Sequence, residues 1–179
     1  MKIISYVLLV STVMMGGGLA LAQSQAYSDY TTIDFDDKQC RTIEDDNPIV
    51  KQYPSFANYQ VNHVAGDNGA QLSVSYGEHG IYVPIMPLGS SLGKKAEWRY
   101  RMVGNKRQYH GLIFRTFKMR DEDYINSNFD APRIEELVVV RLNKEKTCIL
   151  DILPVGKDVN KKARQLADDM NAICSLEYN

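Results

Sequence analysis

Hydrophobic and polar residues alternate in short runs along most of the chain, and turn-forming residues bound each run. In AEWRYRM, residues 96–102, one parity holds Ala96, Trp98, Tyr100 and Met102, and charged residues take the other. A period of two is typical of a β-strand with one packed face and one solvated face. Such runs predict strands at 30–35, 58–64, 70–76, 81–85, 96–102, 109–117, 135–142 and 147–153.

The connections and the chain end complete this picture. Short links such as GEHG and GNKRQ are typical of hairpins, so successive strands are expected to pair antiparallel. Residues 137–142 and 148–153 are apolar in both parities, which predicts central strands covered on both sides. Apolar residues from Val159 to Cys174 recur at helical spacing, and Asp158 is the expected N-cap.

We therefore predict an α+β fold: an antiparallel sheet or sandwich of about seven to eight strands with one C-terminal helix packed on it. Residues 36–56 and 118–133 are expected to be long loops, each with room for a helical turn. Long loops in a compact domain often carry function.

The first residues predict export. Lys2, a long apolar stretch and the small residues Ala20 and Ala22 form the pattern of a secretory leader, which places a signal peptide at 1–22 and a single β-rich domain at 23–179. No later stretch predicts a transmembrane segment. The chain has 21 Lys and Arg and 22 Asp and Glu, so its net charge gives no argument for nucleic acid as a partner. The expected location is periplasmic or secreted.

The three cysteines predict one disulfide. A strand from Cys148 to Leu153 covers about 17 Å, and a helix from Val159 to Cys174 returns about 22 Å, so Cys174 is expected beside Cys148. A thiol at a helix C-terminus is poorly placed for catalysis, and no clustered Cys/His spacing predicts a metal site. Cys40 is then the leftover thiol.

The run from Cys40 to Gly77, followed by AEWR, GLIFR, LVVVRL, a cysteine and a C-terminal helix, resembles a group of small exported proteobacterial proteins with no assigned activity. The resemblance covers most of the chain after the leader and implies an exported β-rich domain. It also implies a second cysteine near Tyr53 or Pro54, which this chain lacks, so Cys40 is expected to be unpaired. The group offers no catalytic residue to transfer.

Three motifs are weighed for chemistry. Ser91 lies in GSSLG, but a strand rather than a helix is predicted to follow it, so a Gly/Ser turn is favoured over a nucleophile elbow. The three histidines fall in or beside different predicted strands. The acidic loop 121–130 carries oxygen ligands suited to calcium, but its spacing departs from the EF-hand. We predict no catalytic residue, no metal and no cofactor; the histidines are His63, His79 and His110, and the loop ligands are Asp121, Asp123, Asn126, Asn128 and Asp130.

The highest density of charge lies in the basic segment 94–107, which contains a single carboxylate, Glu97. If its cations share an outward strand face, they form a patch for phosphate or carboxylate groups. The acidic segment 34–46 offers an alternative, in which the two segments neutralise each other. The candidate ligand-binding residues are Lys94, Lys95, Arg99, Arg101, Lys106 and Arg107.

Three functions remain open. The favoured one is a non-catalytic envelope protein that binds an unknown protein or an anionic envelope polymer through this basic face and the long loops. The second is a small periplasmic hydrolase that uses Ser91 or a histidine-centred site. The third is an inhibitor-like module that acts on a foreign enzyme through residues 118–133.

Overall fold

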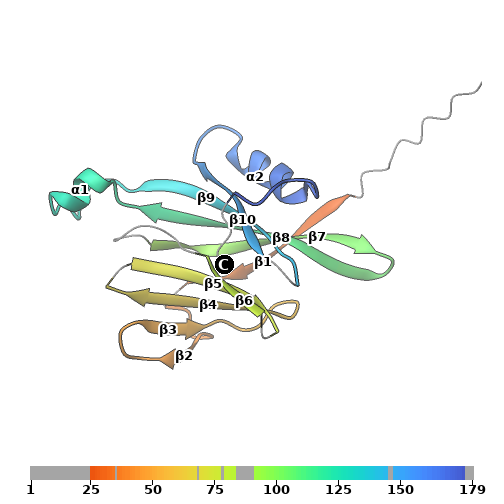
Figure 1. Cartoon of the computed structure of the whole chain (residues 1–179), viewed down its shortest axis with the longest axis horizontal. Helices are drawn as coiled ribbons and strands as arrows, with labels where there is room; N and C mark the ends of the chain where they lie inside the picture. Colours follow the sequence, from red (N-terminus) through yellow and green to blue (C-terminus); the bar gives the residue numbers. More distant parts are fainter. Residues whose placement is uncertain are drawn as a thin grey trace, which may run out of the picture.

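The computed structural model describes residues 25–34, 36–67, 69–77, 79–83, 91–144 and 147–175, and within these ranges ten strands form two five-stranded antiparallel sheets. The sheets lie face to face, and α2 (Val159–Asp168) covers the outer side of one of them (Figure 1). Sheet I has the order β1 (Ala26–Thr32), β7 (Ser91–Val103), β8 (Lys106–Lys118), β9 (Ile134–Arg141), β10 (Cys148–Pro154). Sheet II has the order β2 (Arg41–Glu44), β3 (Ile49–Gln52), β4 (Tyr59–Gly66), β5 (Gly69–Tyr76), β6 (His79–Val83).

The main core lies between the two sheets. Trp98 and Leu112 of sheet I and Leu72 and Val74 of sheet II are fully buried there. The Trp98 indole Nε1 donates a hydrogen bond of 2.8 Å to Thr31 Oγ1, which satisfies its one polar atom. Ala96 and Trp98 therefore face this core, as the alternation predicts, whereas Met102 at the end of the same run is 44% exposed and the prediction is wrong there.

A second core lies between sheet I and α2. Val139 and Leu150 on the outer face of the sheet are buried with Ala163 and Ala167 of the helix. A Cβ built on Gly111 would lie 3.0 Å from Ala167 Cβ, so the glycine allows the helix to approach the sheet closely. A core on each side explains why β9 and β10 are apolar in both parities. The predicted central position is confirmed for β9 and is wrong for β10, which is an edge of sheet I.

The predicted fold class is confirmed: antiparallel sheets in two layers with a C-terminal helix packed on one of them. The predicted disulfide is also present, with the Cα atoms of Cys148 and Cys174 5.8 Å apart, and Cys40 is a free thiol. The predicted leader at 1–22 lies outside the described residues.

Three details of the prediction are wrong. Residues 36–56 are not a long loop, because they contain the hairpin β2–β3, and this raises the strand number to ten. The helix ends at Asp168 rather than Cys174. The strand predicted at 30–35 is displaced, because β1 begins at Ala26 and ends at Thr32. Asp158 is the N-cap residue, as predicted, although it has φ 62° and makes no side-chain capping bond. In the second long loop, residues 118–133, the helical turn is α1 (Asp121–Ile125).

Beyond α2, the chain returns along the edge of sheet I. The backbone N–H of Ser175 donates a hydrogen bond of 2.9 Å to the carbonyl of Ile149 in β10. Cys174 therefore reaches Cys148 from an extended tail and not from a helix end. The half-buried Cys174 side chain packs against the core beneath α2.

Candidate functional site

Two of the predicted ligand-binding cations, Arg99 and Arg101, lie beneath α2. Arg99 is only 7% exposed, and its Nε and Nη2 donate to the two carboxylate oxygens of Asp168 at 3.1 and 2.5 Å. Arg101 donates to the backbone carbonyl of the same residue. The expected solvent-facing patch is therefore wrong for Arg99, because the outward face of β7 is the face that the helix covers.

The polar network around these arginines anchors α2 to sheet I. The His110 Nε2 lies 2.9 Å from Asp168 Oδ1, and Arg164 of the helix donates to both oxygens of Glu97 at 2.7 and 3.1 Å. Burial raises the pKa of the Asp168 carboxyl, but the hydrogen bonds from His110 and Arg99 outweigh it and lower that pKa overall. The network thus holds ionised carboxylates in place between the helix and the sheet.

Two more cations of the segment, Lys106 and Arg107, lie at the far end of the β7–β8 hairpin. Arg107 donates to Asp29 at 2.7 Å and sits 5.0 Å above the Tyr100 ring. Tyr100 is turned to the same face as Trp98, as predicted, but it is only half-buried there. A cation and an aromatic ring are therefore in contact at this end of the hairpin.

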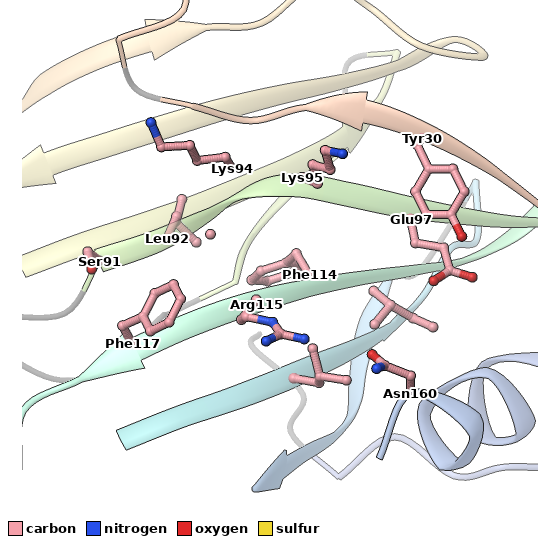
Figure 2. A pocket seen from close by; sticks show the side chains of 13 residues that line it. Tyr30, Ser91, Leu92, Lys94, Lys95, Glu97, Phe114, Arg115, Phe117 and Asn160 are labelled. Carbon is pink, nitrogen blue, oxygen red and sulfur yellow. The ribbon is translucent and has the colours of Figure 1, made fainter. Parts of the chain in front are cut away.

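A groove of about 580 Å³ opens on the outer face of sheet I, beside the first turn of α2. Figure 2 shows its lining, with Lys94 and Lys95 on β7, Arg115 and Phe117 on β8, and Asn160 at the start of the helix. The volume is within the range of small-molecule sites in proteins. The remaining lining residues are Tyr30, Ser91, Leu92, Gly93, Glu97, Ile113, Phe114 and Leu137.

An irregularity in β7 shapes this groove. The β7–β8 register shifts between Leu92 and Ala96, so residues 93–95 bulge opposite Arg115. A Cβ on Gly93 would lie 2.9 Å from the Arg115 Cβ, so only glycine leaves space for that side chain across the strand. The bulge places Lys94 and Lys95 next to each other at the rim.

The three cations of the groove differ in their availability. Lys94 forms an ion pair of 2.8 Å with Asp34, which raises the pKa of the lysine and lowers the pKa of the carboxyl. Arg115 pairs with Glu135 on β9. Lys95 is exposed and, within the described part of the chain, makes no ion pair. The predicted neutralisation by the acidic segment therefore involves Lys94 and spares Lys95.

Among the described residues, the structure does not bring the other candidate groups together. Ser91 is the first residue of β7 and is paired with Phe117, rather than standing at a strand-to-helix turn. His63 lies in the inter-sheet core and His110 contacts Asp168, while His79 belongs to β6. No group of three His, Cys, Asp or Glu side chains suited to a metal ion occurs in the described ranges.

In the loop 121–130, the central carboxylate is already engaged by protein groups. Asp123 is buried and accepts hydrogen bonds from Arg120 Nε at 2.7 Å and from Asn128 Nδ2 at 3.2 Å. These two bonds occupy both of its oxygens. Arg120 and Asn128 therefore hold the Asp123 carboxylate that the sequence offered as a calcium ligand.

Comparison with known proteins gives no match: no family model, curated protein or solved structure matches this chain. Within the described residues, no helix is both long enough and apolar enough to cross a membrane. The resemblance to small exported proteins remains a prediction.

The sequence reasoning found Lys94 and Lys95 but missed the groove around them. Tyr30, Arg115 and Phe117 come from neighbouring strands and share the groove only through the register of β1, β7 and β8. One signal was present in the sequence: the run Gly93–Lys94–Lys95 interrupts the alternation just before residue 96. Such an interruption is typical of a bulge.

Proposed function

We propose that this protein is a non-catalytic exported envelope protein that binds an amphipathic anion in the groove on sheet I. The observation that carries the proposal is Lys95, an exposed cation without an ion pair in the described ranges, which stands at the rim of a groove floored by apolar side chains. The ligand class is therefore a carboxylate or phosphate group joined to an apolar body.

The floor of the groove supports the apolar half of this ligand. Ile113 and Leu137 are nearly covered by their neighbours, and Phe117 is half-buried beside them. Burial of apolar surface contributes about 25 cal/mol per Å², so a hydrocarbon chain that covers this floor gains free energy on binding.

The rim supports the anionic half. An ammonium group that has no carboxylate partner attracts an anion without first losing an existing ion pair. Arg115 can share its guanidinium between Glu135 and a ligand, because the arginine has five N–H donors. Lys94, held by Asp34, contributes mainly to the local positive field.

The disulfide supports an oxidising compartment. A bond between Cys148 and Cys174 persists where thiols are not kept reduced, which is the environment that a cleaved leader at 1–22 would deliver the chain into. A periplasmic or secreted location is part of this proposal.

Titration with octanoate tests the proposal. Octylammonium and 1-octanol, which have the same chain length, are the comparison ligands. Backbone NMR signals of Gly93, Lys95 and Arg115 are expected to shift with octanoate, weakly with 1-octanol and not with octylammonium. Lys95→Gln is expected to weaken octanoate binding by about fivefold, the size of a partly exposed charge-assisted contact.

The matched control is Lys106→Gln, which removes an exposed lysine at the other end of the same hairpin. This variant is expected to bind octanoate like the wild type. Equal binding of octylammonium, or equal weakening by both lysine variants, contradicts an anion site at the groove.

A further inference from the structure

The loop after β8 carries exposed apolar residues at its end. Ile125 is 78% exposed and Phe129 is 57% exposed, and α1 projects beyond the end of sheet I (Figure 1). We call residues 121–130 the α1 tip. Apolar side chains that are exposed together on a projecting loop are candidates for an interaction site.

The α1 tip is held in one conformation by its own contacts. The Asn128 N–H donates to the Asp123 carbonyl at 2.7 Å, in addition to the side-chain bonds of Asp123 with Arg120 and Asn128. The rings of Tyr124 and Phe129 pack edge to face with centroids 6.5 Å apart. A loop that is ordered before binding loses little entropy on docking, so its exposed residues can act as anchors.

The charge of the α1 tip is negative. Asp121 and Asp130 are exposed beside the apolar residues, while Arg120 is engaged by Glu122 at 3.0 Å and by Asp123 at 2.7 Å. The tip therefore combines exposed apolar side chains with carboxylates. This is the chemistry that the groove is proposed to accept.

We propose that the α1 tip of one copy docks into the groove of a second copy of this chain. The inference rests on the proposed function, because it identifies an acidic, apolar protein segment as one amphipathic anion that the groove binds. Ile125 would enter the apolar floor beside Phe117, and the tip carboxylates would face Lys95.

The positions of the two surfaces favour a pair of copies. Phe117 of the groove is close in sequence to Asp121, so groove and tip lie at the same end of sheet I, yet the tip points away from the sheet (Figure 1). The tip of one chain is thus directed outward, where a second copy can receive it. A two-fold arrangement would place each tip in the other groove and make the contact twice.

Sedimentation velocity tests this without any added ligand, at about 10 µM to about 1 mM, where small interfaces associate. The wild type is expected to form dimers as the concentration rises and to lose them in high salt. Ile125→Ser and Lys95→Glu are each expected to weaken association by about tenfold or more. The control Val103→Ser alters a residue that is 59% exposed at the opposite end of β7 and is expected to change nothing.

A mixing experiment gives the sharper result. Copies with Ile125→Ser keep an intact groove, and copies with Lys95→Glu keep an intact tip, so a mixture recovers one tip–groove contact. The mixture is expected to associate more strongly than either variant alone. A monomeric wild type throughout the range, no recovery on mixing, or equal weakening by Val103→Ser overturns the proposal.

Two further arms separate other outcomes. If the chain stays monomeric but phosphatidylcholine vesicles retain it in an Ile125-dependent manner, the tip binds a bilayer and the proposal is wrong. If octanoate binds at low concentration while the chain stays monomeric, the proposed function stands and this inference fails. If the chain associates and the mixture recovers this association, but octanoate does not bind, the tip–groove contact stands and the proposed binding of small amphipathic anions fails.

Discussion

Removing Arg99 tests whether the buried network beneath α2 is structural. Arg99→Met deletes two hydrogen bonds to the Asp168 carboxylate and leaves that group with His110 as its remaining side-chain donor. Loss of one partner from a buried ion pair costs about 3–5 kcal/mol in the free energy of unfolding. The Asp168 side chain keeps 21% exposure, which allows water to reach it, so we expect a loss of about 2–4 kcal/mol.

Urea unfolding followed by fluorescence measures this loss, because Trp98 is the only tryptophan and lies in the main core. The matched variant is Arg107→Met, which breaks the exposed pair with Asp29 and is expected to cost less than about 1 kcal/mol. Once folded, Arg99→Met is expected to bind octanoate like the wild type. A loss below about 0.5 kcal/mol, or a selective loss of octanoate binding, refutes the anchoring role.

Two other expectations concern the cores. Burial, aided by the charge of Lys51, lowers the pKa of His63 from 6.5 to about 4, so the unfolded chain binds a proton that the folded chain does not as pH falls from about 6.5 to about 4. The free energy of unfolding should therefore drop by up to about 3 kcal/mol across this pH window. Urea unfolding of His63→Gln should show a smaller dependence of this free energy on pH, and an equal pH dependence in both proteins contradicts the reasoning. Gly111→Ala places a methyl group 3.0 Å from Ala167 Cβ and should destabilise the fold by about 1–3 kcal/mol in thermal unfolding, whereas Gly156→Ala, with open space around it, should not; equal effects refute the close approach.

Most strands of both sheets were predictable because they are long enough for alternation to show, although β1 was predicted four residues too late. The hairpin β2–β3 was missed because each of its strands has four residues, and all of β2 is exposed. An exposed strand has no apolar face, so period-two reasoning has nothing to detect. The disulfide was predictable because its geometry depends only on the direction of β10 and the return of the chain.

The end of α2 shows how an apolar pattern can mislead. Met170, Ile173 and Cys174 continue the helical spacing, but Met170 and Ile173 are exposed and only Cys174 packs against a core. The apolar spacing therefore extends beyond the hydrogen-bonded helix. Tertiary contacts of the tail, which the sequence does not reveal, decide the boundary.

The candidate site was predicted in part. Parity correctly separated Arg99 from the inter-sheet core, but it gives no information on which part of the outer face a helix covers. α2 has ten residues and is about 15 Å long, whereas β7 and β8 have thirteen each and extend about 43 Å. The groove exists because of this mismatch in length.

The tail that follows α2 has a protective effect on the sheet. β10 is an outer strand, and outer strands offer unpaired backbone groups onto which another polypeptide can polymerise. The bond between Ser175 and Ile149, locked by the sulfur bridge next to it, fills part of that ladder. Cleaving the bridge would therefore uncover a template for fibrous assembly, so the covalent link guards against aggregation as well as unfolding.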